Sequence, residues 1–508
     1  MFTLWNAKQI LDSMKRTQTY STLAIAALTS TVLSASAQTP PAEALINKLV
    51  AKGVLTQDEA KELMSEGTQT NQASASKWKL SDTIKSIGLY GDVRLRYEYR
   101  GAENAAGATP DTFEKERFRY AVRLGIRGEL YDDFNYGLRV ETSTNPRSPW
   151  ATFGNNTSAG SVTPSDKSQS GIGIGQVYLG WHPTDWYEMT VGRMPMPLYT
   201  TPMVWDSDIN PEGAFEKFKY SFNNVDLFAD FGQFDYQDPS SANALHSSDT
   251  FVLAWQLGAN LRIDKNMSFK IAPAFYNYTG VGTTGNGLNL PFVGQGNAAG
   301  ANAGVPGATA ANLAAYNQNG INNLQILEIP AEFNLKVNNS PLGPIQVRAF
   351  GDFAYNLSGD SRARAAYSAN PSAFPGLSGA ATGQDKAYQI GLGIGSSGPL
   401  YGPTQGLVYG SFSKKHAWEL RAYWQHIEQY ALDVNLIDSD FFEGRGNLEG
   451  VYVALAYGIS DAIIGTVRYG YAQRINNKLG TGGNNLDLPT LNPIRDYNLL
   501  QLDLTWRF

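Results

Sequence analysis

The chain has 508 residues, no cysteine, 51 glycines, 12% aromatic residues and a formal net charge of −6. Its mean hydropathy is −0.29, and beyond the N-terminal leader no run reaches the roughly 20 apolar residues of a membrane-spanning helix, which excludes a helical membrane protein. The charge is mild and no basic cluster occurs, so nucleic acid is not expected as a partner.

The N-terminus has the features of a secretory signal peptide, which we assign to residues 1–37. Lys15 and Arg16 form its charged region, residues 23–33 form a short apolar core, and Ala35-Ser36-Ala37 is an A-x-A cleavage site. The apolar core is too short for a membrane anchor. We therefore expect a mature protein in an oxidising compartment, which the absence of cysteine also suits.

Residues 38–85 are expected to form a periplasmic helical hairpin and a linker. The apolar spacing at 40–67 is helical, Gly53 ends the first helix, and Thr56 with Glu59 forms a capping box that opens the second. Two short helices are not a stable domain alone. They either pack locally or act as an oligomerisation or cell-wall contact.

A strict alternation of apolar and polar residues begins after this linker and is longest at 117–142. Phe118, Tyr120, Val122 and Leu124 share one face, while four arginines and Glu129 lie on the other. Asp132-Asp133 interrupts the pattern and predicts a hairpin turn. Strands of ten to fourteen residues exceed the five or six usual in soluble sandwiches. An apolar face and a charged face predict staves of an outer-membrane barrel.

The alternation recurs to the C-terminus, and it predicts that residues 86–508 form an all-β, transmembrane, antiparallel, up-and-down barrel of about 16 strands. The expected strands are 87–99, 118–130, 134–140, 173–181, 187–191, 214–222, 225–231, 251–263, 269–278, 327–337, 345–355, 388–394, 418–424, 451–459, 463–471 and 500–508.

The connections between these strands alternate in length. Those at 132–133, 183–186, 223–224, 264–267, 338–344 and 460–462 are short, and those at 100–116, 143–171, 194–213, 235–249, 279–323, 356–386, 428–449 and 473–496 are long. Short turns on one rim and long loops on the other are typical of outer-membrane barrels, with the short rim periplasmic. The link at 395–417 is long where a turn is expected, so a strand extension at 406–411 or a further hairpin stays open there.

The last strand places Leu500, Leu502, Leu504, Trp506 and Phe508 on one face. A terminal aromatic residue on the lipid face resembles the C-terminal signature of bacterial outer-membrane barrels.

Several longer segments resemble the bacterial putative porin family of outer-membrane β-barrel porins, over most of residues 42–508. These segments are LVAKGVLTQDEAKEL, YGDVRLRYEY, RFRYAVRLGIRGELYDDFNYGLRVETSTNP, GRMPMPLY, VWDSDINPEGA and DSDFFEG. The resemblance implies a passive channel in the cell outer membrane, in contact with its lipid and lipopolysaccharide and assembled as a homotrimer. It does not name the solute, so a substrate-dedicated channel of the phosphate or polysaccharide type stays open.

The candidate pore-lining residues are charged side chains on the expected lumen face and on one loop. The wall supplies Arg94, Arg96, Arg119, Arg123, Arg127 and Arg139 from three consecutive strands, and the loop after Arg193 supplies Asp206, Asp208 and Glu212. If this loop folds inward, its acids face the arginines across a constriction, where fixed charges select permeant ions. The alternative is that the arginines form cross-strand ion pairs that brace the wall, and that the acids are solvated loop charges.

Other chemistry has weaker support in the sequence. Aromatic residues gather near strand ends, as in interfacial girdles, whereas lumen-facing tyrosines are too scattered to indicate a sugar-stacking track. A calcium ion could bind through the oxygen atoms of Asp433, Asn435, Asp438, Asp440 and Glu443. The spacing lacks the EF-hand glycine and register, which favours an acidic loop without an ion. None of the four histidines has a nucleophile at barrel spacing, so we expect neither an enzyme nor a cofactor or metal.

The sequence therefore predicts a porin, a water-filled channel for passive diffusion of small hydrophilic solutes or ions with a charge-biased constriction. The alternative from another class is a structural outer-membrane protein tethered through its N-terminal helices.

Overall fold

The computed structural model describes residues 81–104, 112–143, 145, 148–154, 171–237, 250–279, 324–369, 377–396, 414–481 and 494–508. The predictions for the signal peptide, for the helical hairpin and for the strand extension at 406–411 lie outside these residues. Residues 82–508 belong to one compact unit.

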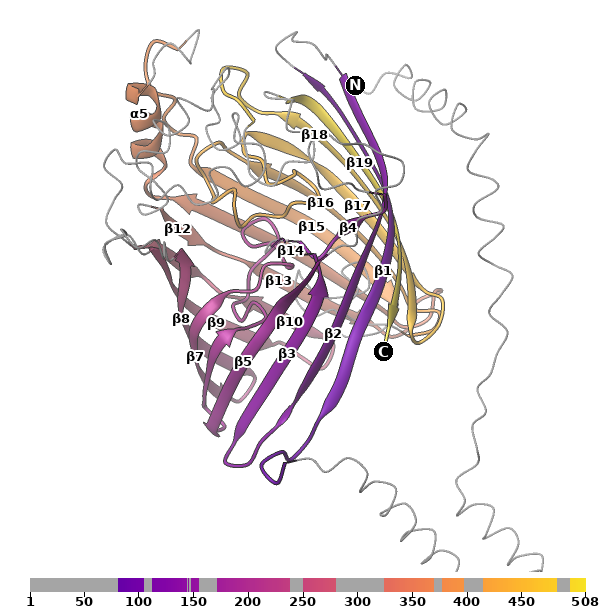
Figure 1. Cartoon of the computed structure of the whole chain (residues 1–508). Coiled ribbons are helices and arrows are strands. Elements are labelled where there is room, and N and C mark those ends of the chain that lie inside the picture. Colours follow the sequence, from indigo (N-terminus) through magenta and orange to yellow (C-terminus); the bar gives the residue numbers. More distant parts are fainter. Residues whose placement is uncertain are drawn as a thin grey trace, which may run out of the picture. The chain divides into compact units, whose positions relative to one another are not determined.

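One antiparallel sheet forms this unit, and it closes on itself because β1 pairs with both β2 and β19 (Figure 1). Its strands are β1 (Gly88–Asn104), β2 (Thr112–Glu129), β3 (Phe134–Thr142), β4 (Ala151–Thr152), β5 (Ile172–Thr184), β6 (Tyr187–Arg193), β7 (Glu212–Phe222), β8 (Val225–Gln237), β9 (Thr250–Arg262), β10 (Met267–Ile271), β11 (Ala274–Tyr278), β12 (Gln325–Glu328), β13 (Ala331–Val337), β14 (Ile345–Asn356), β15 (Lys386–Ser396), β16 (Trp418–Ile427), β17 (Leu448–Gly458), β18 (Ile463–Arg474) and β19 (Ile494–Arg507).

These 19 segments make 16 staves. β10 and β11 are one stave interrupted at Pro273, and β12 and β13 are one stave interrupted at Pro330. Proline has no N–H to donate to the ladder, so regular pairing breaks there. β4 is a two-residue piece that pairs with β2 beyond the end of β3. The predicted number of strands is confirmed.

The hairpin at 117–142 is also confirmed. Residues Arg123–Glu129 of β2 pair with Asn135–Glu141 of β3, and Asp132 and Asp133 have φ values of 59° and 62°. Positive φ at both central residues is the requirement of a primed turn, whose twist matches that of the flanking strands. An aspartate tolerates this conformation better than most residues because its short polar side chain bonds locally.

Short turns and long connections lie at opposite rims. The turns after β2, β5, β7 and β17 lie at the lower rim in Figure 1, and helix α5 (Gly359–Ala369), between β14 and β15, lies at the upper rim. The first loop is shorter than the expected 100–116, because pairing of β1 with β2 continues to Glu103 and Thr112. Within the described residues, no helix is long and apolar enough to cross a membrane.

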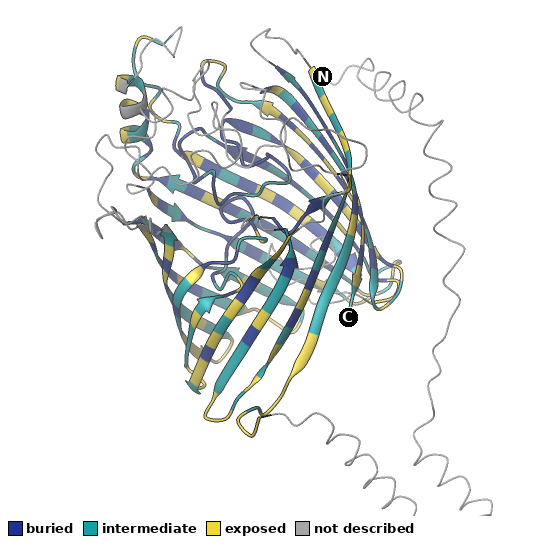
Figure 2. Ribbon diagram, in the orientation of Figure 1, coloured by how far each residue is buried: buried dark blue, intermediate teal, exposed yellow. Residues whose placement is uncertain are grey.

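The two faces of the wall differ as the alternation predicts. Leu89, Leu257, Ile390 and Leu392 are among the exposed large apolar residues, whereas their neighbours point into the barrel. Inside, part of the lumen is filled by two connections, 194–211 and 428–447, whose Met203, Trp205, Leu436 and Phe441 join a buried apolar cluster with lumen-facing wall residues. Figure 2 shows these inner segments largely in dark blue.

Candidate functional site

The connection between β6 and β7, residues 194–211, folds into the barrel and contacts the lumen face of β9, β12 and β14. Gln256 on β9 brackets the backbone of Tyr199, accepting from its N–H at 2.8 Å and donating to its carbonyl at 2.8 Å. Thr200 donates to Glu328 Oε1 at 2.7 Å, and Thr201 donates to Asp352 Oδ2 at 2.5 Å. This loop, which we call the first inward loop, is therefore fixed to β9, β12 and β14, which lie two to five staves beyond β7 around the barrel.

Glu328 and Asp352 anchor the first inward loop. Sequence reasoning did not predict this role for either residue. Both are buried on the lumen face, and Tyr276 adds a hydrogen bond of 2.6 Å to Glu328 Oε2. In the sequence each is one more polar residue in an alternating strand. The adjacent hydroxyls Thr200-Thr201 in an otherwise apolar stretch are the signal that could have found them.

The structure separates the three acids that the sequence grouped. Asp208 lies 2.5 Å from Arg123 on β2, which brings a predicted loop acid to a predicted wall base. Asp206 instead accepts from the N–H of Ser439 at 3.1 Å and from its hydroxyl at 3.0 Å. Glu212 is the first residue of β7 and pairs with Arg193 at 2.9 Å, with 57% of its side chain exposed.

The six predicted arginines lie together on β1, β2 and β3, and most of them have carboxylate partners. The ion pairs are Arg94–Asp92 at 2.6 Å, Arg96–Asp503 at 2.8 Å, Arg96–Asp440 at 2.9 Å, Arg119–Glu98 at 3.6 Å, Arg123–Glu141 at 3.5 Å and Arg139–Glu141 at 2.9 Å. Three of these pairs, Arg96–Asp503, Arg119–Glu98 and Arg123–Glu141, link neighbouring staves, which is the arrangement that the bracing interpretation expects.

The lower part of this patch has more arginine than acid. Arg127 lies over the ring of Tyr90 at 4.9 Å, and Arg507 stands opposite Asp92 in the β1–β19 register. Among the described residues, neither arginine has a carboxylate oxygen within 4.0 Å. The excess cationic charge is therefore concentrated on Arg127 and Arg507, of which sequence reasoning predicted the first and missed the second.

The connection between β16 and β17, residues 428–447, is a second inward loop that sequence reasoning did not predict. Asp433 accepts from Tyr236 on β8 at 2.7 Å, Asp440 accepts from Arg96 on β1, and Glu443 accepts from Arg445 at 2.9 Å. The carboxylates of this loop that could bind calcium thus point to separate partners. The repeated tripeptide Asp-Ser-Asp, at 206–208 and 438–440, is a signal that could have linked the two loops.

Burial and neighbouring charge divide the loop acids. Burial raises the pKa of Asp206 well above its usual range, and Asp208 and Asp438 add to this effect. Burial also raises the pKa of Asp208, but Arg123 and Arg94 outweigh it and leave that pKa below its usual value. Burial, with the nearby Asp440, raises the pKa of Asp438 to about 6.

This difference predicts a pH-dependent selectivity. Below pH 6 the Asp438 carboxyl takes up a proton, so the constriction loses one negative charge while Arg100 beside it stays positive. The preference for anions is expected to rise as pH falls from 8 to 5, with an inflection near 6. Reversal potentials measured across a salt gradient at stepped pH test this. Asp206, whose pKa is also raised, changes charge in the same direction, so Asp438→Asn is expected to remove only the part of the change near pH 6. An unchanged pH profile in that variant would contradict the assignment.

The aromatic residues near the strand ends pack against one another in groups. Phe134 stacks on Trp181 at 6.0 Å, and Trp186 stacks on Phe218 at 6.2 Å. Such clusters suit the interface between water and lipid, where one end of the side chain is wet. Of the lumen-facing tyrosines, Tyr276 and Tyr423 are buried, which leaves them little surface for stacking on a solute.

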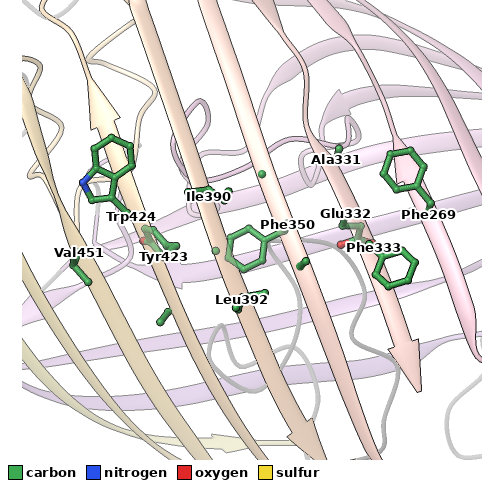
Figure 3. Close-up of a pocket in the computed structure, with 14 residues that line it drawn as sticks. Phe269, Ala331, Glu332, Phe333, Phe350, Ile390, Leu392, Tyr423, Trp424 and Val451 are labelled. Atoms are coloured by element: carbon green, nitrogen blue, oxygen red, sulfur yellow. The ribbon is translucent and has the colours of Figure 1, made fainter. Parts of the chain in front are cut away.

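A hollow of about 700 Å³ lies over β10 and β13 to β17 (Figure 3). Small side chains at Ala331, Ala349 and Ala422 contribute to its lining, between larger groups such as Phe269 and Leu392. Along each strand these residues alternate in step with the exposed apolar residues, so they lie on the same face of the sheet. The hollow therefore belongs to the outer face of the wall and is separate from the lumen.

The closed sheet, the alternating faces and the two inward loops define an outer-membrane β-barrel. A sequence profile described as "Putative porin" matches residues 103–508. The match covers more than three quarters of the chain, which therefore belongs to the putative porin family. It is an outer-membrane porin, and both family and fold point to a channel rather than an enzyme.

Comparison with solved structures finds remote likenesses. The Salmonella typhi OmpF complex with daunomycin shares 9% identity, covers 85% of this chain and 100% of its own, and has a TM-score of 0.42. Vibrio cholerae OmpT shares 10% identity over 84% of this chain and 100% of its own, with a TM-score of 0.38. A mutant Rh. blastica porin shares 11% identity, covers 83% of this chain and 100% of its own, and has a TM-score of 0.36. A search of curated proteins found no significant match.

Proposed function

We propose that this porin passes small hydrophilic solutes and ions by passive diffusion, through a constriction whose fixed charges favour anions. The observation that carries the proposal is the charge balance on the lower lumen wall. There, within the described residues, five arginines and Lys85 face four carboxylates, of which Glu129 pairs with Lys85 at 3.6 Å. The arginines are Arg94, Arg123, Arg127, Arg139 and Arg507, and the other three carboxylates are Asp92, Glu141 and Asp208.

The arrangement of these charges supports selection by field and not by tight binding. The wall charges are held by ion pairs and by the barrel backbone, so they keep their positions while ions pass. A narrow, low-dielectric passage lined by one sign of charge raises the local concentration of the opposite sign. The paired arginines brace the wall, and the unpaired excess biases the passage, so the two roles coexist.

Planar-bilayer recording of the purified protein tests the proposal. Stable conductance steps are expected, with a reversal potential under a potassium chloride gradient that indicates faster passage of chloride. Solute added at low concentration is expected not to block the current. Absence of current would favour the structural, tethering alternative, and block at low concentration would favour a substrate-dedicated channel.

The family also suggests a homotrimer in contact with outer-membrane lipid and lipopolysaccharide. Three conductance steps of equal size in one insertion event are expected from such an assembly.

A further inference from the structure

The second inward loop spans the lumen much as the first one does. It leaves β16, reaches β8 through the 2.7 Å hydrogen bond from Tyr236 to Asp433, and reaches β1 and β19 through Asp440. Asp440 accepts from Arg96 at 2.9 Å and from Gln501 at 3.0 Å, and its carbonyl accepts from Arg100 at 3.1 Å. These contacts join staves on different sides of the barrel through one loop.

The two inward loops are bonded to each other inside the barrel. The N–H of Asp438 donates to the carbonyl of Pro202 at 2.9 Å, and the N–H of Asp206 donates to the carbonyl of Leu436 at 2.5 Å. Ser439 donates twice more to the carboxylate of Asp206. Four hydrogen bonds thus connect the two inward loops, and two of them run directly between the Asp-Ser-Asp tripeptides, so the loops form one unit.

The two aspartates of each tripeptide have different roles. Asp206 accepts from the N–H of Asp208 at 2.9 Å, and Asp438 accepts from the N–H of Asp440 at 3.1 Å, so the first aspartate closes its own turn. The second aspartate of each tripeptide extends to an arginine of the wall, Asp208 to Arg123 and Asp440 to Arg96.

Exposure to the lumen distinguishes the acids further. The side chain of Asp440 is 29% exposed and that of Asp208 is 17% exposed, whereas Asp206 is 4% exposed overall. A passing ion can approach a charge in contact with pore water closely, whereas it stays farther from a buried charge, and the Coulomb energy falls with distance. Asp440 also lies beside Arg96 and Arg100, whose side chains are almost fully buried.

We propose that the constriction is built jointly by the two inward loops, and that Asp440 on the second loop is a specificity-determining residue. Its carboxylate offsets the positive charge of Arg96 and Arg100 at the water-exposed surface, and so limits the preference for small inorganic anions over monovalent cations. This inference rests on the proposed channel function.

The test uses the reversal potential of single channels in a potassium chloride gradient. Asp440→Asn is expected to raise the ratio of anion to cation permeability by about two- to fourfold at low salt, because a unit charge about 10 Å from an ion in water changes its energy by about 0.4 kcal/mol. Asp226→Asn is the matched control, because Asp226 has a similar exposure of 30% and pairs with Arg262 at 2.8 Å, but it lies on β8 outside both inward loops. It is expected to leave the ratio unchanged.

A second measurement uses the natural absence of cysteine. In Asp440→Cys channels, a methanethiosulfonate reagent with a sulfonate group is expected to restore the wild-type reversal potential. A reagent with a trimethylammonium group is expected to shift it further toward anions. Asp206→Cys channels are expected to react slowly or not at all, because that side chain is buried.

The outcomes distinguish a failure of the proposed channel function from a failure of the role of Asp440. Wild-type protein without current would overturn the proposed function itself. If the wild type conducts but Asp440→Asn has an unshifted reversal potential, or shifts no more than Asp226→Asn, the role of Asp440 is overturned and the channel function stands. If Asp440→Asn forms no channels, Asp440→Glu keeps the charge and is expected to conduct with wild-type selectivity. An altered selectivity in that variant, with no effect of thiol reagents on Asp440→Cys, would overturn the inference.

Discussion

Replacing Arg127 and Arg507 together with glutamine is expected to shift the channel strongly toward cations. These two side chains supply the arginine excess of the lower lumen wall, and no described carboxylate lies within 4.0 Å of either. By the Coulomb estimate of about 0.4 kcal/mol per unit charge at about 10 Å in water, each replacement lowers the anion-to-cation ratio by roughly two- to fourfold. The reversal potential under a salt gradient measures the change, which is expected to shrink above about 0.1 M salt.

A matched control for this pair is Arg262→Gln. Arg262 pairs with Asp226 at 2.8 Å at the end of β9, and its side chain is 49% exposed. A solvated charge at the rim is screened by water and salt, so this variant is expected to keep the wild-type reversal potential. An equal shift in Arg262→Gln would show that the selectivity depends on total charge and not on the arginine patch.

Replacing Thr200 and Thr201 with valine is expected to loosen the first inward loop. The two hydroxyls donate to Glu328 on β12 and to Asp352 on β14, and valine keeps the shape of threonine without the donor. Each buried acceptor that loses its donor costs about 1 to 3 kcal/mol, which is enough to populate displaced positions of the loop. Single-channel recordings are expected to show larger current noise and a higher mean conductance, with the reversal potential nearly unchanged.

Ser221→Ala is the control for the threonine pair. Ser221 donates to Asp226 at 2.8 Å, so the variant also removes a hydroxyl-to-carboxylate bond, but at an exposed position. Its noise and conductance are expected to match the wild type. Quiet, wild-type currents from the threonine variant would mean that the backbone contacts of Gln256 and of the second inward loop hold the first loop by themselves.

The wall of the barrel could be predicted because its rule is local. The side-chain period of a strand is two, so a register such as Phe118, Tyr120, Val122 and Leu124 indicates a lipid-facing surface without knowledge of any neighbour. Neighbouring staves are also consecutive in the chain, so Arg94, Arg119 and Arg139 could be placed on one patch from their order alone. The short turns add chemistry of their own, as at Asp132-Asp133.

The interior of the pore could be predicted only in part. The sequence indicated that Asp208 meets an arginine of the wall if its loop folds inward, and Asp208 does lie beside Arg123. It also grouped Glu212 with the loop acids by proximity in the chain, whereas Glu212 begins β7 and pairs with Arg193. Nearness along the chain is a poor guide here because the chain changes from loop to strand between the two acids.

The sequence by itself determined the class of protein, the strand number and the face on which the arginines lie, because each follows from a periodicity of neighbouring residues. Only the tertiary structure decided which arginines keep an uncompensated charge and which loops enter the lumen. Those features depend on contacts between distant parts of the chain, such as Arg96 with Asp440 and Thr201 with Asp352. Closing the barrel brings these groups together, and the distance of each charge from the water-filled passage and from its partner then sets how strongly it acts on a passing ion.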